Sequence, residues 1–205
     1  MEFGAELRDA VRDAQAGVDV VMLAVRAHRL SSGGKRVQKV AIVTGSSRGI
    51  GAAIARQAAA EGYAVCVNYH ASEDRALEVV ESIENLGGRA IAVQADVGIE
   101  ADIVRLFDET ERQLGRPDVL VNNAATTGRR CLIEDVDLDM LDTVFRLNIG
   151  GYFICAREAI KRMSTKYGGR GGIVVNVSSV AALLSNAFDW VHYGASKGAI
   201  DTFTR

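Results

Sequence analysis

The fold of this chain is decided by the stretch Val40-Ala41-Ile42-Val43-Thr44-Gly45-Ser46-Ser47-Arg48-Gly49-Ile50-Gly51. An apolar run passes into a loop with glycines at positions 45, 49 and 51, and a segment of helical character follows. Such a loop turns sharply, lets backbone N–H groups approach a phosphate and lets the next helix pack against the strand; glycine serves all three needs because it lacks a side chain. The start of that helix adds free N–H donors and a positive dipole. We therefore expect a strand, a phosphate-binding turn and a helix; a glycine-rich turn that binds no ligand is the alternative.

Outward from this stretch, apolar runs alternate with helical segments. The runs are continuous in apolar residues, as in strands that are covered on both faces. The expected strands are Val40–Val43, Ala64–Val67, Ala90–Val93, Val119–Val121 and Ile173–Val177. The expected helices are Gly49–Glu61, Glu73–Asn85, Glu100–Leu114, and a pair at about Leu138–Leu147 and Tyr152–Met163. Repeated strand–helix–strand units predict a three-layer α/β fold, in which a doubly wound parallel sheet lies between helices.

The composition excludes several other classes of protein. The 205 residues carry 24 basic and 26 acidic side chains, a net charge of −2, which does not suit an electrostatic nucleic-acid binder. No apolar segment approaches the length of a membrane span. The three cysteines, Cys66, Cys131 and Cys155, are far apart and odd in number, so neither a disulfide framework nor a zinc site fits. We expect reduced thiols in a cytoplasmic protein, with no metal and no membrane partner.

Residues 1–38 differ from the rest of the chain. They hold six basic and five acidic residues, with Leu7, Val11 and Ala14 at helical spacing, and Ser31-Ser32-Gly33-Gly34 breaks any helix. We expect an N-terminal extension that is partly helical or flexible, followed by one domain over residues 39–205. A targeting peptide is disfavoured because transit peptides avoid acidic residues. A start codon that lies upstream of the real one is a further alternative.

Glycine or a polar residue follows each expected strand. In chain order these positions are Gly45, Asn68, Asp96-Val97, Asn122-Asn123-Ala124 and Ser178-Ser179. The carboxyl ends of parallel strands share one edge of the sheet, where ligands of such folds bind, so these residues together predict the floor of a pocket. Any one of them alone is explained by turn chemistry.

The end of the second expected strand bears on the choice of nucleotide. A cofactor with a free ribose 2′-hydroxyl usually meets an acidic residue about 20 residues after the glycines. Asn68, Tyr69 and His70 stand there instead, and Glu73 falls within the next helix. Arg48, in the glycine loop, is able to face a 2′-phosphate. The sequence therefore favours NADP(H) over NAD(H).

Tyr193 and Lys197 have the spacing of a catalytic pair. Positions four apart on a helix lie on one face, so both side chains can reach one cavity. A nearby ammonium favours the phenolate, which suits Tyr193 to donate or accept a proton near neutral pH. This pair is common by itself, but Ser179 follows the fifth expected strand and is able to hydrogen-bond a substrate oxygen. Asn148 could hold a water that reloads the proton path.

In type, order and spacing, these motifs resemble those of the short-chain dehydrogenases/reductases over roughly residues 38–205. The motifs are T-G-x-x-x-G-x-G, Asp96-Val97, Asn122-Asn123-Ala124, Asn148, Ser179 and Y-x-x-x-K. The resemblance implies a Rossmann-like fold and hydride transfer between NAD(P)H and a ketone or secondary alcohol. It implies that Tyr193 is the general acid/base and that Lys197 assists it and binds the nicotinamide ribose. It further implies that Ser179 orients the substrate oxygen and that Asn148 supports the proton relay.

The resemblance also implies contacts with the cofactor and with other subunits. The glycine loop would line the phosphates, Asp96 and Val97 would contact the adenine, and Asn123 would lie beside the ribose. The full expected set is Gly45, Ser47, Arg48, Gly49, Ile50, Gly51, Asn68, Asp96, Val97, Asn123, Ala124, Tyr193 and Lys197. Members of the family usually form homodimers or homotetramers, in which the helix at Tyr152–Met163 and the helix that starts near Tyr193 pack against their copies.

Two features depart from the family pattern. Ala125 stands where the family has glycine, and we expect little effect from its methyl group. The sequence stops at Arg205, whereas the family domain continues with two more strands and a substrate lid. We therefore expect a fold without its last strands, in which the fifth strand is an unprotected edge and the helix with Tyr193 lacks packing partners. A non-catalytic dinucleotide-binding module, or an inactive fragment, is the alternative function.

Overall fold

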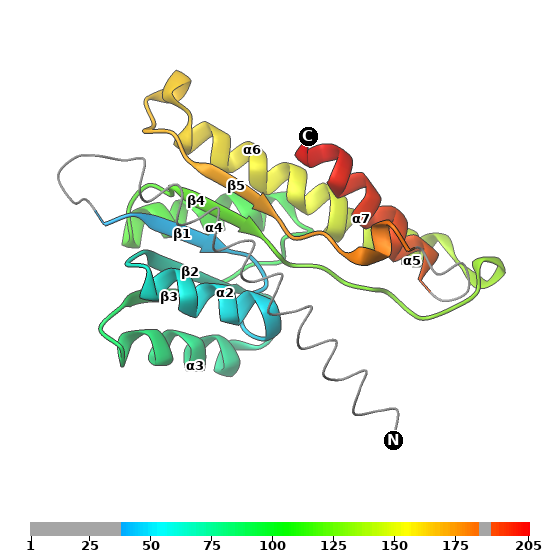
Figure 1. The fold of residues 1–205 in the computed structure, drawn as a ribbon, viewed down its shortest axis with the longest axis horizontal. Coiled ribbons are helices and arrows are strands. Elements are labelled where there is room, and N and C mark those ends of the chain that lie inside the picture. The colour runs from blue at the N-terminus through cyan, green and yellow to red at the C-terminus, as the bar shows by residue number, and fades with distance from the viewer. Residues whose placement is uncertain (1–37, 185–189) are drawn as a thin grey trace.

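A computed structural model of the chain describes residues 38–184 and 190–205, and it contains a five-stranded parallel sheet (Figure 1). The strand order is β3-β2-β1-β4-β5. The strands are β1 (Val40–Val43), β2 (Ala64–Tyr69), β3 (Arg89–Gln94), β4 (Val119–Asn122) and β5 (Ile173–Asn176). All four pairings are parallel, so the predicted parallel sheet is confirmed. The expected N-terminal extension lies outside the described residues.

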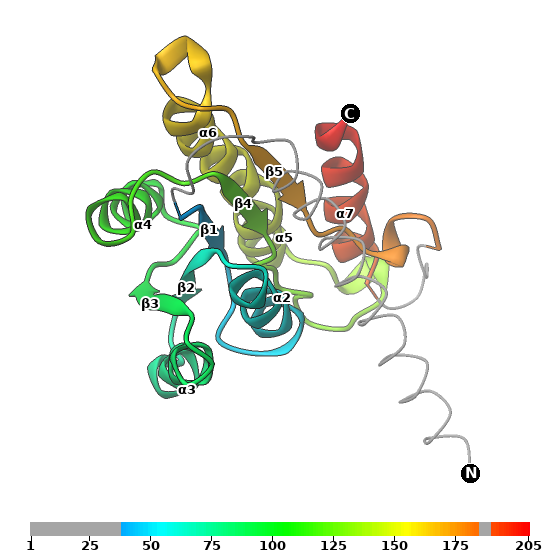
Figure 2. The same ribbon diagram turned by 60° about the vertical axis from the view of Figure 1, so that its left-hand side comes forward.

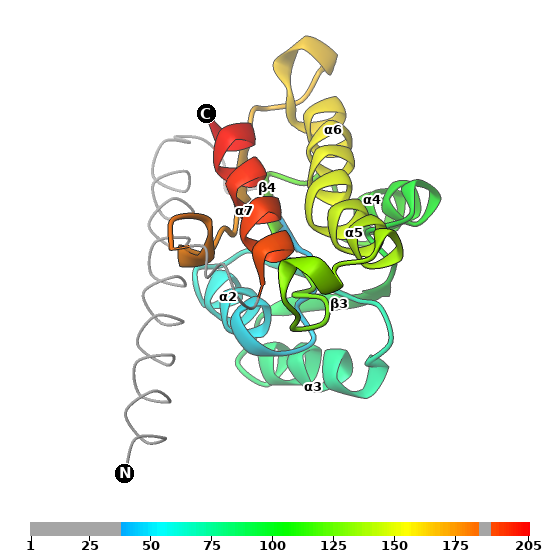
Figure 3. The ribbon, with the colours of Figure 1, turned by 90° about the vertical axis from the view of Figure 1, so that its right-hand side faces the viewer.

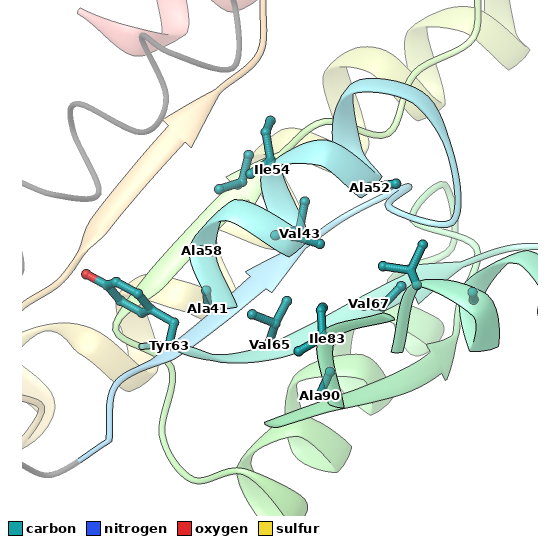
Figure 4. Close-up of a cluster of buried hydrophobic side chains, with 14 of the residues drawn as sticks. Ala41, Val43, Ala52, Ile54, Ala58, Tyr63, Val65, Val67, Ile83 and Ala90 are labelled. Atoms are coloured by element: carbon teal, nitrogen blue, oxygen red, sulfur yellow. The ribbon is translucent and has the colours of Figure 1, made fainter. Parts of the chain in front are cut away.

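Helices cover both faces of the sheet, which gives three layers (Figures 2 and 3). On one face, α2 (Gly49–Ala60) and α3 (Glu73–Glu84) pack on the strands through an apolar cluster that includes Ile54, Val65, Val79 and Ile83 (Figure 4). On the other face, α4 (Glu100–Gln113) and α6 (Gly151–Met163) pack through Ile42, Leu106, Phe107, Cys155 and Met163. The strands read as continuous apolar runs because both of their faces are covered.

The two helices expected at Leu138–Leu147 and Tyr152–Met163 form one continuous path. A π-helical turn, η2 (Arg146–Gly150), joins α5 (Leu138–Phe145) directly to α6. Gly151 allows this path to pass close to the loop after β3, because a Cβ there would lie 2.5 Å from the carbonyl oxygen of Val97. A π-turn within a helix is frequent at functional sites. Asn148 lies inside this one and is buried.

The last described elements lie beyond β5. The short helix η4 (Val180–Ala182) follows that strand, and α7 (Val191–Thr204) packs against η4, η2 and α5. Asn176 Nδ2 donates to Thr204 Oγ1 at 3.1 Å, which joins the end of β5 to the end of α7. Within residues 38–184 and 190–205, β5 pairs with β4 alone, and no helix there has the length and apolarity that crossing a bilayer requires.

Candidate active site

The glycine turn is bound tightly to the end of β4. Thr44 Oγ1 accepts hydrogen bonds from the backbone N–H groups of Asn123 (2.9 Å) and Ala124 (3.1 Å). Asn123 Nδ2 donates in return to the carbonyl oxygens of Thr44 and Gly45. Gly45 has a φ of +61°, and a Cβ there would lie 2.8 Å from Ala124 Cα. The turn therefore needs glycine both for its backbone conformation and for its close approach to β4.

Asn68 joins the turn to the ends of β2 and β3. Its Oδ1 accepts from Gly45 N at 3.0 Å, and its Nδ2 donates to the carbonyl oxygens of Val93 and Ala95. The side chain is buried, and both ends of its amide are used inside the protein. The sequence predicts Asn68 as a cofactor contact; in the structure its side-chain amide holds Gly45 in position.

The N-terminus of α2 suits a phosphate. Arg48 precedes the helix without capping it through its side chain, and the first turn of α2 contains no acidic residue. The loop residues Arg48 and Gly49 are exposed, and Ser47 and Ile50 are partly exposed. Backbone N–H groups at an uncapped helix start, together with the helix dipole, attract an anion. The residues present therefore fit the phosphates of a dinucleotide.

Asp96 and Val97 follow β3 at the same edge. Asp96 Oδ1 accepts from Gly98 N at 2.8 Å, and Asp96 N donates to Asp102 Oδ2 at 2.9 Å, so these bonds attach the loop to the start of α4. His70, at the end of β2, places its Nε2 4.0 Å from Asp96 Oδ2. Val97 is buried. These contacts bring the loops after β2 and β3 together, as their positions in the sequence predict.

Lys197 lies beside Tyr193 and is 1% exposed. Its Nζ donates to the carbonyl oxygen of Val177 at 2.7 Å and to Tyr152 Oη at 3.1 Å. The same nitrogen lies 5.9 Å from the centre of the Tyr193 ring. Burial lowers the pKa of Lys197 to about 8, and the Asp201 carboxylate acts in the opposite direction. The Lys197 ammonium thus lies near the Tyr193 phenol and has two hydrogen-bond acceptors of its own, Val177 O and Tyr152 Oη.

A second chain of hydrogen bonds reaches the backbone of Tyr193. Asn148 Nδ2 donates to Ser196 Oγ at 3.0 Å, and Ser196 Oγ donates to the carbonyl oxygen of Tyr193 at 2.7 Å. The Asn148 amide also exchanges two hydrogen bonds with the backbone of Thr126, both at 2.9 Å. The structure therefore brings Asn148 to the helix that carries Tyr193 and Lys197, across 48 residues of sequence.

Ser179 belongs to the same edge of the sheet. It caps η4, where its Oγ accepts from Ala181 N at 3.2 Å, and η4 packs against α7. The neighbouring Ser178 Oγ donates to the carbonyl oxygen of Lys197 at 3.5 Å. The end of β5 is thus attached to the middle of α7, so Ser179 and Tyr193 do not lie on opposite sides of the molecule.

Two residues of this site were missed in the sequence. His192 is buried, and its Nε2 lies 2.8 Å from the carbonyl oxygen of Thr127, so it fixes the start of α7 against the segment after β4. Its position next to Tyr193 was the available signal. Tyr152 contacts Lys197 from α6, and an aromatic residue in an amphipathic helix gives no such signal. In the described part of the chain, no cluster of His, Cys, Asp and Glu is suited to hold a metal ion.

Comparison with known proteins agrees with this geometry. The sequence pattern of the family described as short chain dehydrogenase matches residues 39–205. The chain is 46% identical over 165 residues to the uncharacterized oxidoreductase YgfF of Escherichia coli (strain K12), which covers 80% of this chain and 67% of that protein. Other curated reductases match at 40–43% identity, and the chain spans only 60–62% of their length.

Solved structures are similar in both sequence and fold. One is a short chain dehydrogenase from Burkholderia cenocepacia J2315 in complex with NADP, which is 37% identical with a TM-score of 0.76 over 83% of this chain and 67% of that one. Another is the angucycline C-6 ketoreductase LanV with bound NADP, 37% identical with a TM-score of 0.73 over 80% of this chain and 64% of that one. By its matched pattern, its relatives and its fold, the chain belongs to the short-chain dehydrogenase family.

Proposed function

We propose that this chain is the coenzyme-binding and catalytic part of an NADP(H)-dependent oxidoreductase that interconverts a ketone and a secondary alcohol. One observation carries the proposal. At the carboxyl edge of the sheet, which also bears the glycine turn, Asn148 reaches the backbone of Tyr193 through Ser196, and Lys197 Nζ lies 5.9 Å from the centre of the Tyr193 ring. The NADP-bound ketoreductase LanV, which shares the fold, supports the same class of reaction.

Each side chain has a distinct part in the proposed reaction. The nicotinamide coenzyme, when bound, supplies or accepts the hydride. Tyr193 gives a proton to the carbonyl oxygen during reduction and takes it back during oxidation. The Lys197 ammonium stabilises the phenolate that reduction leaves behind. Ser179 orients the substrate oxygen, and Asn148 holds the relay that restores the proton.

The direct test replaces the phenol of Tyr193. Tyr193→Phe should lower the turnover of NADPH with a panel of ketones by about 10²–10⁴-fold, because only the proton donor is lost. Calorimetry should show unchanged NADPH binding. Tyr167→Phe is the matched control, since Tyr167 is exposed and belongs to η3 (Thr165–Tyr167), which holds none of the predicted site residues. Turnover that survives Tyr193→Phe would contradict the assignment of the acid/base.

A preference for NADP(H) over NAD(H) is part of the proposal. Arg48 is exposed at the start of α2, whereas Glu73, the first acidic residue after β2, lies in α3, and its carboxylate accepts a hydrogen bond from Tyr69 Oη at 3.0 Å. Arg48→Gln should raise KM for NADPH by roughly tenfold and leave KM for NADH nearly unchanged, because a charge-assisted bond to phosphate contributes about 1.5–3 kcal/mol. Arg56→Gln, further along the same helix, is the control. Tighter binding of NADH by the parent chain would refute the preference.

A non-catalytic dinucleotide-binding module is the second candidate. The partial burial of every residue in β5, the strand that leads to the helix with Tyr193, favours it. Calorimetric binding of NADPH without turnover of any ketone would support this candidate against the first. Binding with turnover that depends on Tyr193 would reject it.

The oligomeric state and the cellular compartment of the protein are the last parts of the proposal. Phe153 and Ile160 are exposed on α6, and the Phe153 ring stacks on Phe203 of α7 at 3.9 Å between centroids. This apolar surface supports a homodimer or homotetramer built on α6 and α7, which sedimentation of the chain would test. Cys66 and Cys155 are buried free thiols, which supports a reducing, cytoplasmic compartment.

A further inference from the structure

Tyr152 lies directly against the buried amine of Lys197. The residue stands in the first turn of α6 and is 1% exposed, among the largest fully buried side chains of the described chain. Lys197 Nζ lies 5.0 Å from the centre of the Tyr152 ring and 3.1 Å from its hydroxyl oxygen. The amine therefore has two phenols beside it, Tyr193 on its own helix and Tyr152 on the helix opposite.

Three polar atoms form a closed triangle at this point. Lys197 Nζ donates to Tyr152 Oη at 3.1 Å and to the carbonyl oxygen of Val177 at 2.7 Å. Tyr152 Oη donates to that same carbonyl at 3.2 Å. Because Val177 follows β5, the triangle joins α6, α7 and the end of β5. The phenol is thus an acceptor for the ammonium and is itself held by the backbone.

The triangle is one of two hydrogen-bonded links between these helices. Asn148 and Tyr152 are four residues apart on the path from η2 into α6, so they share one face. Asn148 bonds Ser196, and Tyr152 bonds Lys197. The first link supports the backbone of Tyr193, and the second supports the amine beside it.

An ammonium has three N–H donors. Val177 and Tyr152 take two of them, which leaves one for Tyr193 or for a bound ribose. Without the Tyr152 oxygen, a buried ammonium would lack an acceptor, and it would turn or lose its proton to avoid that cost. The hydroxyl of Tyr152 thereby restricts the direction in which Lys197 offers its remaining donor.

We propose that Tyr152 is a positioning residue of this site, a neutral phenol that accepts a hydrogen bond from Lys197 and holds its ammonium beside Tyr193. Its significance for catalysis rests on the proposed function, whereas its effect on Lys197 does not. Burial raises the pKa of Tyr152, so this phenol stays protonated and does not compete with Tyr193 as the acid/base.

Other titratable groups face the triangle and are accounted for in the test. Asp201 on α7 acts on Lys197, and Tyr193 on α7 and Cys155 on α6 act on Tyr152. Burial raises the pKa of Cys155 to about 12, so its thiol is neutral near pH 7. The Asp201 carboxylate is unchanged in a Tyr152 variant, so its influence cancels between variant and parent.

The first experiment measures the titration of Lys197 by NMR of lysine labelled at Cε, without cofactor. The spectrum is simple because the chain has only five lysines, at positions 35, 39, 161, 166 and 197. In Tyr152→Phe the pKa of Lys197 should fall by about one unit below that of the parent, since the ammonium loses an acceptor while the ring remains. In Tyr167→Phe, whose ring also lies near a lysine, it should not change. An unchanged pKa of Lys197 in Tyr152→Phe overturns the proposal.

The second experiment measures kcat/KM against pH with NADPH and a ketone. Tyr152→Phe should lower kcat/KM about tenfold near pH 7. It should also shift the pH profile of kcat/KM to lower pH, as the pKa of Lys197 falls. Tyr167→Phe should retain the parent values. An unaltered profile overturns the role in catalysis. If the parent itself shows no turnover, the proposed function fails, and the NMR titration still decides whether Tyr152 holds Lys197.

A second pair of variants covers the case in which Tyr152→Phe does not fold. Tyr152→Gln keeps an oxygen acceptor without the ring, and Tyr152→Met offers only a weak sulfur acceptor at similar length. A higher Lys197 pKa in the Gln chain than in the Met chain supports the proposal. Equal values overturn it.

Discussion

The strands around the glycine turn are more deeply buried than β5, the strand that leads to the helix with Tyr193 and Lys197. Every residue of β1, β2 and β4 is buried, whereas every residue of β5 is only partly buried. Beyond β5, Val180 and Leu183 remain largely exposed. Side-chain hydrogen bonds are nevertheless present in both regions, at Thr44 and Asn68 in the first and at Asn148 and Lys197 in the second.

The difference in burial between these strands shows that the arrangement of a site's side chains and the stability of that arrangement have different sources. Short-range hydrogen bonds arrange the side chains, and the burial of apolar surface supplies most of the stability that keeps them arranged. In the region of the glycine turn both are present. In the region of β5 and α7 the hydrogen bonds are present with less buried surface, so we expect local opening to start there.

The largest difference between the glycine turn and α7 is expected when one methyl group is added to each, in Gly51→Ala and Gly198→Ala. In Gly51→Ala, the new Cβ would lie 2.5 Å from Asn123 Nδ2 and 2.6 Å from the carbonyl oxygen of Gly45. We expect a loss of about 3 kcal/mol in the free energy of unfolding, measured with urea, because that backbone is fixed on all sides. NADPH binding should weaken by at least about tenfold as the turn shifts.

The matched control is Gly198→Ala in α7. A Cβ there meets no described atom within 4 Å, so the substitution should stabilise the helix by up to about 1 kcal/mol through propensity alone. Equal losses in the two variants would show that the close approach at Gly51 is not what makes it sensitive.

The next test compares two valines in register on the same face of the sheet. Val121 in β4 pairs with Val175 in β5, and both pack toward the cluster under α2. Val121 is 1% exposed, whereas Val175 is only partly buried. Val121→Ala should cost about 2 kcal/mol of unfolding free energy, because two buried methyl groups are lost and a cavity is left.

Val175→Ala should cost less than about 1 kcal/mol, since part of its side chain already contacts water. Urea unfolding of the two variants in parallel measures the difference directly. Equal costs would indicate that β5 is as well covered as β4, and the contrast between the two regions would then be wrong.

The smallest expected effect is a pH dependence of stability that belongs to Lys197. Because burial lowers its pKa to about 8, the folded chain releases this proton at a lower pH than the unfolded chain does. Between about pH 8 and pH 10 the unfolded state binds more protons, so raising the pH stabilises the folded parent. The gain should be about 1 kcal/mol between pH 7 and pH 9.

Lys197→Met lacks this titration and is the reference. The difference in melting temperature between parent and variant should move in favour of the parent as the pH rises from 7 to 9. A difference that is independent of pH would mean that Lys197 has an ordinary pKa in the folded chain and is not held in a desolvated position.

Much of the fold was predictable because its signals are local. Each strand is a short, continuous apolar run, and each expected strand lies within two residues of an observed one. The glycine turn was equally clear, since its conformation depends on residues next to one another in sequence. The π-turn at Asn148 was not predicted, and neither was the close approach of Gly151, which follows it, to the backbone of Val97, 54 residues earlier.

The motif residues of the site were predictable from the sequence, but the hydrogen bonds that hold them in place were not. The spacing of Tyr193 and Lys197 follows from the helix repeat, and their neighbourhood with Asn148 follows from the parallel sheet. Asn68 stays a predicted cofactor contact, and the sequence did not show that its amide also holds Gly45 and β3. The sequence shows which residues are polar, but not which of their side chains form hydrogen bonds with other protein atoms.

By itself, then, the sequence determined the parallel α/β architecture, the glycine turn and the order of the family motifs, because periodicity and glycine placement act over a few residues. Only the tertiary structure decided that Tyr152 bonds Lys197 across 45 residues, that His192 anchors the start of α7, and that β5 is less covered than β4. Contacts of this kind depend on which helix faces come together in space, and an amphipathic pattern specifies that a face is buried without specifying its neighbour.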